Sequence, residues 1–195
     1  RAPLAVKIDL QKVSKTFGDK KVLDELDLAI YEGESVVILG GSGSGKSVLL
    51  KHMIGLLRPD SGRIVVDGID IATLGDREIT GFRRRFGMSF QEGALFDSMT
   101  VWENVAFALR RAKRPKDEIA ARVAECLEMV HLEGAETKMP AELSGGMRRR
   151  VGFARAIALE PKILLFDEPT TGLDPVMKAV VDELILELQA KLGST

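Results

Sequence analysis

The sequence predicts an α/β fold, because stretches with the apolar pattern of strands alternate with stretches that have the pattern of helices along its 195 residues. Between Leu4 and Leu10, apolar and polar side chains alternate as in a strand with one buried face. Residues 35–39 and 163–166 are instead continuous apolar runs, which are typical of strands buried on both faces of a parallel sheet. The chain therefore predicts an antiparallel layer and a parallel core.

Three further strands are predicted from the same patterns. Apolar residues alternate again from Leu26 to Ile30, and this run is expected to lie antiparallel to the first strand. Another strand is predicted at residues 63–66, followed by Asp67-Gly68, a dipeptide typical of a two-residue hairpin turn. The last is predicted around residues 86–90.

Apolar residues at helical spacing predict the helices. The first helix follows the run at 35–39, and its apolar face comprises Leu49, Leu50, Met53, Ile54 and Leu57. A short polar helix and then a longer helical stretch come next, where Thr100 and Glu103 form a capping box. The apolar stripes behind that box comprise Val101, Val105, Ala108 and Leu109 in one helix and Ile119, Val123, Cys126, Leu127 and Val130 in the next.

Two more helices are predicted in the last third of the chain. Gly145-Gly146 opens one of them, and Pro161 closes it. The other begins at Asp174, an N-cap residue followed by proline at the first helical position, and runs to Gly193. Its inward side is expected to comprise Val180, Val181, Leu184 and Leu188.

Composition and charge limit the functions that this chain can have. Apolar residues make up 45% and charged residues 29% of the sequence, a balance typical of a folded domain and not of a disordered chain. The 28 Lys and Arg residues nearly balance the 29 Asp and Glu residues, whereas a dedicated nucleic-acid binder would need an excess of cations. Cys126 is the only cysteine, which excludes an internal disulfide and fits a reducing compartment. No apolar run approaches the roughly 20 residues that cross a bilayer, so we expect any membrane role to be peripheral.

A glycine-rich segment between a predicted strand and a predicted helix matches the phosphate-binding loop of nucleotide-binding proteins. It comprises Gly40, Gly41, Ser42, Gly43, Ser44, Gly45, Lys46 and Ser47. Glycines let backbone N–H groups converge on phosphate oxygens, and the start of a helix adds positive partial charge. Lys46 is expected to reach the terminal phosphates, and the Ser47 hydroxyl is expected to bind magnesium. The alternative is a plain turn rich in glycine and serine.

Two carboxylates directly follow the apolar run at 163–166. A buried strand of a parallel sheet would place Asp167 and Glu168 at its carboxyl end, where such sheets bind ligands. Asp167 suits magnesium, and Glu168 can then orient or deprotonate an attacking water. The alternative is an acidic start to the following helix.

A second glycine pair also precedes a predicted helix. Leu143 and Ser144 come before Gly145-Gly146, and the N–H groups at this helix start form another potential anion site. Taken alone, the segment is as readily an ordinary glycine-rich helix entry. Its order relative to the other motifs favours a ligand site.

These motifs, in this order, resemble the ATP-binding cassette (ABC) ATPases across nearly the whole chain. The resemblance implies ATP and Mg²⁺ as cofactors, with Gln91 at the end of its strand contacting magnesium and the attacking water. It implies that Ser144, Gly145 and Gly146 bind the ATP held by a second protomer, and that Asp174 communicates across the dimer.

The resemblance extends to the nucleotide base. Phe17 lies where the family places an adenine-stacking aromatic residue, more often tyrosine, and stacking needs only a π face. A core residue is the alternative reading of Phe17. Val48 completes the implied nucleotide-binding set, although Val48 and Gly41 replace commoner residues of the family. The implied metal ligands are Ser47, Gln91 and Asp167.

Several segments are similar to the ATPase subunits of Mla-type lipid transporters, which work with MCE-domain proteins. These segments are residues 90–97, 143–150 and 154–161. Met147 departs from the glutamine that is usual in the wider family and agrees with this branch. The similarity implies a subunit that powers phospholipid transport, with a multi-spanning permease and an MCE-type protein as partners.

The architecture implied by the resemblance is a P-loop NTPase core of the ABC ATPase type, with an antiparallel β-subdomain and an inserted helical subdomain. We expect one domain over residues 1–195. Residues 1–91 and 151–195 would form the nucleotide-binding core with the β-subdomain, and residues 92–150 the helical signature subdomain. Two copies would sandwich ATP as a homodimer, cytoplasmic and peripheral on the inner face of the cell membrane.

One feature of the family has no counterpart here. ABC ATPases carry a switch histidine at the end of the strand after the last predicted helix, and the chain ends at Thr195, before that strand. His52 and His131 lie elsewhere in the order and are interpreted as structural or surface residues. We therefore expect a fragment that binds MgATP but hydrolyses it slowly.

Two alternatives remain for the role of the basic clusters, and further ones remain for the class of ABC protein. Residues 83–85, 110–116 and 148–150 are either solvated faces or, with Trp102, part of a groove that receives a coupling helix of the permease. The whole chain could also be a soluble ABC protein of DNA repair or translation, or a nucleotide-dependent interaction module with little turnover.

Overall fold

A long hairpin of two strands begins the fold. In the computed structural model, which describes residues 5–90 and 93–195, β1 (Val6–Phe17) and β2 (Lys20–Tyr31) pair antiparallel. β3 (Ser61–Val66) pairs with the other edge of β1, and β4 (Ile69–Asp70) follows it in the order β2-β1-β3-β4. This sheet confirms the predicted antiparallel layer, except that Leu4 of the predicted first strand lies outside the described residues.

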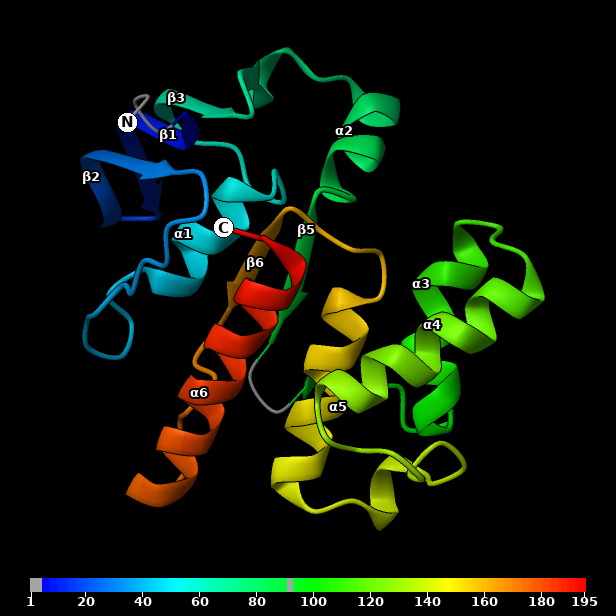
Figure 1. The fold of residues 1–195 in the computed structure, drawn as a ribbon. Coiled ribbons are helices and arrows are strands. Elements are labelled where there is room, and N and C mark those ends of the chain that lie inside the picture. Colours follow the sequence, from blue (N-terminus) through cyan, green and yellow to red (C-terminus); the bar gives the residue numbers. More distant parts are fainter. Residues whose placement is uncertain (1–4, 91–92) are drawn as a thin grey trace. The chain divides into compact units, whose positions relative to one another are not determined.

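The chain divides into two compact units. The N-terminal unit comprises residues 1–85 with Thr195, and the C-terminal unit comprises residues 86–194. The N-terminal unit holds the antiparallel sheet (Figure 1) together with α1 (Lys46–Met53), the 3₁₀ turn η1 (Ile71–Thr73) and α2 (Asp76–Arg83).

The turn between β3 and β4 shows how local chemistry builds this sheet. Asp67 and Gly68 have φ angles of 49° and 74°, and Val66 is paired with Ile69 across them. Positive φ at both central residues is what a tight hairpin turn needs to match the twist of its strands. The predicted Asp67-Gly68 turn is confirmed.

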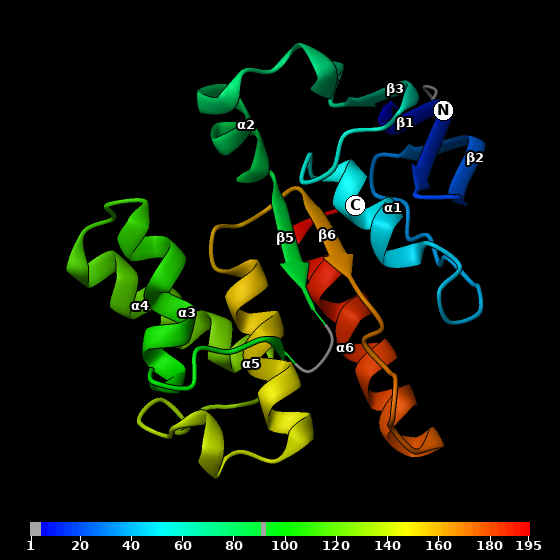
Figure 2. The same ribbon diagram turned by 180° about the vertical axis from the view of Figure 1, so that it is seen from behind.

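The C-terminal unit is built on a pair of parallel strands. β5 (Phe86–Ser89) and β6 (Ile163–Phe166) run side by side in the same direction (Figure 2), which confirms the predicted parallel pairing of residues 163–166. The helices of this unit are α3 (Val101–Arg111), α4 (Lys116–Met129), α5 (Gly145–Ile157) and α6 (Pro175–Leu192), with a 3₁₀ turn, η3 (Pro140–Glu142), before α5.

Helix starts in this unit follow the predicted capping chemistry. The Thr100 hydroxyl accepts from the Glu103 N–H at 3.2 Å, and Glu103 Oε2 accepts from the Thr100 N–H at 2.9 Å. At α6, Asp174 Oδ1 accepts from the N–H groups of Val176 and Met177 at 3.0 and 3.1 Å. Because both caps depend only on residues within one helical turn, sequence alone located them.

Three predictions of the apolar pattern are wrong. The first concerns the extent of the first helix: α1 ends at Met53, so Leu57 of its predicted apolar face lies beyond the helix. Residues 35–39 form no strand, and Val37 and Leu39 are 78% and 88% exposed. A buried parallel strand needs partners on both sides, and within the described residues this run joins no strand ladder. On α6, Val181, Leu184 and Leu188 are buried as expected, but Val180, at the edge of the stripe that they form, is 47% exposed.

Helix α5 packs on β5 at very short range. A Cβ atom on Gly152 of α5 would lie 2.7 Å from the Cα of Gly93, and one on Gly87 of β5 would lie 2.7 Å from Pro161 Cγ and nearer still to the Ala156 carbonyl oxygen. Glycine at these two places is therefore required by the approach of the backbones. No helix in the described part of the chain is long and apolar enough to cross a membrane.

Asn104 should be the most sensitive polar position of the C-terminal core. It is fully buried, accepts from the Phe96 N–H at 2.9 Å, and donates to the carbonyl oxygens of Phe96, Met99 and Thr100. Asn104→Ala leaves these backbone groups without their partner, and we expect a loss of about 3 kcal/mol in unfolding free energy. Urea unfolding measures it, with Lys178→Ala on the exposed side of α6 as control; equal midpoints for the two variants would contradict the expectation.

Candidate nucleotide-binding site

The phosphate loop lies in the N-terminal unit, at the start of α1. Gly43 and Gly45 have φ angles of 73° and 98°, and Gly45 is the N-cap residue of the helix. A side chain is disfavoured at such angles, and a Cβ on Gly45 would also lie 2.8 Å from Val22 Cγ1. Alternation of left- and right-handed backbone turns N–H groups toward one concave side, which is an anion-binding arrangement.

The charged side chain of the loop is folded back across it. Lys46 Nζ donates to the carbonyl oxygens of Gly40 and Gly41 at 2.7 and 2.9 Å. Ser47 and Val48 follow in the first turn of α1, so their backbone N–H groups belong to the positive end of the helix. His52, one turn later, is fully buried with Nδ1 at 2.7 Å from the Val48 carbonyl oxygen, which agrees with its interpretation as a structural residue.

Phe17 is an exposed aromatic residue at the end of β1. Its side chain is 45% exposed, so the alternative of a core residue is wrong. Lys15 Nζ lies 5.5 Å from the ring centroid. The ring is thus available to stack on a planar ligand, and a cation lies close to it.

The predicted acidic pair lies in the C-terminal unit, where two parallel strands end together. The Asp167 N–H donates to the Ser89 carbonyl oxygen at 2.9 Å, which extends the ladder of β5 and β6 by one residue. Phe90 follows β5 at the same edge; the next residue, Gln91, lies outside the described residues. Parallel strands present ligand-binding groups at this edge, because all their carboxyl ends meet there.

Glu168 has a constrained backbone. Its φ angle is 49°, in the left-handed region that a residue with a side chain rarely adopts, and Glu168 Oε2 accepts from the Thr171 hydroxyl at 3.2 Å. Seven other described non-glycine residues have φ angles between 43° and 56°, so this conformation by itself does not mark a functional position.

The structure connects Glu168 to helix α5 through a residue that the sequence analysis placed only in a basic cluster. Arg149 is 7% exposed, and its Nη2 donates at 2.9 Å to the carbonyl oxygen of Thr171, whose hydroxyl donates to Glu168. No sequence signal could have predicted this contact, because Arg149 and Thr171 are 22 residues apart and only the folded chain brings them together.

Three more arginines of the basic clusters also donate to backbone carbonyl groups inside their own unit. Arg148 reaches Leu143, Arg150 reaches Val130 and His131, and Arg83 reaches Ile54 and Gly55. These three guanidinium groups therefore hold segments of their own unit together, and the docking groove stays a prediction. Arg110 differs, because its guanidinium lies over the Trp102 ring at 4.9 Å from the centroid.

Side-chain packing does not require glycine at Gly145 or Gly146. Ser144 caps α5 by accepting from the Met147 N–H at 3.2 Å. A Cβ on Gly145 would meet nothing within 4 Å, and one on Gly146 would meet only Met177 Cε, at 3.9 Å. The backbone at the start of α5 is therefore not covered by neighbouring side chains at these two positions.

The oxygen donors predicted for magnesium suit that ion. A serine hydroxyl and a carboxylate, here Ser47 and Asp167, are hard ligands of the kind that Mg²⁺ prefers, and substrate phosphates usually complete its coordination. Within the described residues there is no cluster of three His, Cys, Asp or Glu side chains that could hold a metal ion.

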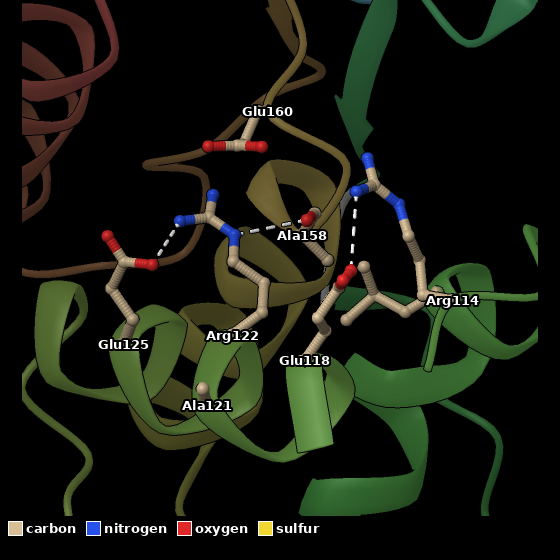
Figure 3. Close-up of a pocket in the computed structure, with 8 residues that line it drawn as sticks. Arg114, Glu118, Ala121, Arg122, Glu125, Ala158 and Glu160 are labelled. Carbon is tan, nitrogen blue, oxygen red and sulfur yellow. Dashed lines mark hydrogen bonds and ion pairs between the residues drawn. The ribbon is translucent and has the colours of Figure 1, made fainter. Parts of the chain in front are cut away.

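A charged cavity of about 280 Å³ lies elsewhere in the C-terminal unit and contains no predicted site residue (Figure 3). Arg122 crosses it, donating to the carbonyl oxygens of Ile157 and Ala158 at 2.8 and 3.1 Å and pairing with Glu125 at 2.7 Å. These bonds satisfy the carboxyl end of α5, so the arginine has a structural role.

Cys126, on α4 near this cavity, should be unreactive in the folded protein. Burial raises the pKa of its thiol to about 12, so the thiolate that reacts with disulfide reagents is scarce at pH 8. We expect modification by Ellman's reagent to be at least about 100-fold slower than in urea, where the thiol is exposed. Equal rates with and without urea would contradict this expectation.

A phosphate loop that opens a helix and a carboxylate pair after a parallel strand define a P-loop nucleotide-binding protein. The sequence model of the family described as "ABC transporter" matches residues 23–171. The chain belongs to this family.

Known relatives agree with this assignment. "Probable ribonucleotide transport ATP-binding protein mkl" of Mycobacterium leprae (strain TN) is 46% identical over 196 residues, covering 100% of this chain and 56% of its own length. "Intermembrane phospholipid transport system ATP-binding protein MlaF" of Haemophilus influenzae (strain ATCC 51907 / DSM 11121 / KW20 / Rd) is 44% identical, covering 96% and 72%. The chain spans about half the length of the first relatives that it matches.

A solved structure shows the same fold. The "Dimeric structure of a post-hydrolysis state of the ATP-binding cassette MJ0796 bound to ADP and Pi" has a TM-score of 0.86 and 36% identity, covering 96% of this chain and 85% of that one. The predicted fold class, a P-loop NTPase of the ABC type with an antiparallel sheet and helical elements, is confirmed.

Proposed function

We propose that this chain binds and hydrolyses ATP and thereby drives lipid transport by an ABC transporter. The observation that carries the proposal is the phosphate loop, in which left-handed Gly43 and Gly45, the amino end of α1 and the Lys46 ammonium all serve a highly charged anion. Bound Mg²⁺ would supply charge neutralisation at the phosphates, with Ser47, Asp167 and Gln91 as its protein ligands.

In this proposal the chain's own residues orient the attacking water. Glu168 would accept its proton, and Gln91 would hold it in line. The Thr171 hydroxyl supports this role, because its hydrogen bond to Glu168 Oε2 at 3.2 Å helps to orient the carboxylate. Adenine would stack on Phe17.

A second copy of the chain would complete the site. Ser144, Gly145 and Gly146 would bind the γ-phosphate held by that copy, and Asp174 would transmit closure between the two. The open space around Gly145 supports this role, as does the dimeric state of the solved relative.

The aromatic surface formed by α3 and the preceding Phe96 is the proposed contact with a multi-spanning permease. Trp102 under Arg110, and Phe96, 41% exposed beside Phe107, combine aromatic area with cations, as protein interfaces often do. Such a complex would hold the chain on the cytoplasmic face of the cell membrane, with an MCE-type protein in the wider assembly.

Phospholipid is the proposed cargo because residues 90–97, 143–150 and 154–161 are similar to the Mla-type branch, and the MlaF relative is named for phospholipid transport. Ribonucleotide is the second candidate, because the mkl relative is named for its transport.

Co-purification tests this function. The tagged protein, expressed in the organism that it comes from, should co-purify with a multi-spanning permease. The ATPase activity of this complex should rise when phospholipid is added but not when ribonucleotide is added. Activity without any membrane partner would instead favour a soluble ABC protein, and tight ATP binding without turnover would favour an interaction module.

A further inference from the structure

We propose that Lys20 is a further nucleotide-binding residue, whose ammonium binds the phosphate nearest the nucleoside of a nucleoside di- or triphosphate. This inference rests on the proposed function. Lys20 begins β2, is exposed, and its Nζ donates to the carbonyl oxygen of Gly43 in the phosphate loop at 3.3 Å. Lys20 belongs to none of the motifs found in the sequence.

The hairpin brings Lys20 to this place together with Phe17. The two residues are direct cross-strand partners, separated only by the Gly18-Asp19 turn. A nucleotide whose base stacks on Phe17 and whose terminal phosphates lie in the loop must pass its first phosphate between the two. Lys20 lies in that interval, because its backbone is beside Phe17 and its ammonium is beside Gly43.

The other lysines of the hairpin have different partners. Lys7, Lys12, Lys15 and Lys21 pair with the carboxylates of Asp67, Asp27, Asp60 and Asp24, respectively. Among the described contacts of the hairpin, only the Lys20 ammonium donates to a neutral carbonyl oxygen of the loop. An ionised phosphate is a stronger acceptor than a carbonyl group, so an arriving nucleotide would displace the Gly43 contact.

The charge around the loop favours the same outcome. Residues 35–59 contain no Asp or Glu, so the segment that includes the loop carries no acidic side chain of its own. Lys46 lies over the carbonyl groups of Gly40 and Gly41, and Lys20 lies over that of Gly43. Two ammonium groups at different points of the loop can serve two different phosphates of one nucleotide.

The test compares Lys20→Gln with Lys21→Gln. Lys21 is the next residue of the strand, on its other face, and pairs with Asp24. We expect Lys20→Gln to weaken binding of both ADP and ATP by a similar factor of roughly three to tenfold, and Lys20→Arg to restore it. Lys21→Gln should bind as the parent does. Titration with fluorescent ADP and ATP analogues measures the affinities, and thermal melting checks that each variant folds.

The glutamine variant distinguishes phosphate binding by Lys20 from a purely structural contact with the loop, because glutamine keeps a donor for the Gly43 carbonyl group but removes the charge. Parent-like affinity of Lys20→Gln would overturn the inference, and so would a loss confined to ATP, which would place the ammonium at the third phosphate. A parent chain that binds no nucleotide would overturn the proposed function itself. A parent that binds, with a Lys20→Gln variant that binds equally, would overturn only the inference.

Discussion

We expect the Lys46→Ala variant to lose measurable ATP binding. The variant deletes the ammonium that lies across the loop at 2.7 and 2.9 Å from the Gly40 and Gly41 carbonyl oxygens. A triphosphate carries several negative charges, and a cation held at fixed distance contributes charge-assisted hydrogen bonds that backbone N–H groups alone do not replace. We expect affinity to fall on the order of 100-fold or more.

Titration with a fluorescent ATP analogue measures this loss. Lys51→Ala is the matched control, since Lys51 is an exposed lysine of the same helix at its other end. Removal of Lys51 changes the net charge equally and should leave affinity near that of the parent. Unchanged affinity of Lys46→Ala would refute the assignment of the phosphate loop.

Glu168→Gln should separate binding from hydrolysis. The amide keeps the shape of the side chain and its contact with the Thr171 hydroxyl, but it is too weak a base to take a proton from water. We expect ATP affinity close to that of the parent and a fall in hydrolysis of roughly 100- to 10,000-fold. Because ATP would then persist between two copies, the ATP-bound dimer should accumulate.

Phosphate release measures hydrolysis, and light scattering with ATP and Mg²⁺ measures dimer formation, both in the same length of chain as the parent. Glu183→Gln, at an exposed position of α6, is the control for removing one carboxylate. Parent-like turnover of Glu168→Gln would show that another group is the base. A variant that lost ATP binding as well would show that Glu168 has a role in holding the nucleotide.

Local chemistry explains which parts of the fold could be predicted. The Thr100 and Glu103 box, the Asp174 cap and the Asp67-Gly68 turn each depend on residues within a few positions of one another, and all three are present in the structure. Asp167 and Glu168 directly follow β6, as the apolar run before them predicts, for the same reason.

The predictions that the structure corrects depend on tertiary packing. The run at 35–39 has the composition of a buried strand, but a strand is defined by its neighbours, and composition does not specify them. By sequence, four apolar residues including Val180 fit one stripe of α6, but packing in the core buries only Val181, Leu184 and Leu188.

The sequence by itself determined the family, the phosphate loop and the acidic pair at residues 167–168, because these signals consist of neighbouring residues whose order alone specifies a turn, a helix start and a strand end. Only the tertiary structure decided how several basic residues are used. Arg149 reaches Thr171, and Lys20 reaches Gly43, across 22 and 23 positions of the chain. The physical reason is that a long cationic side chain binds whichever acceptor the fold brings within about 3 Å, and the neighbouring residues in the sequence do not specify that acceptor.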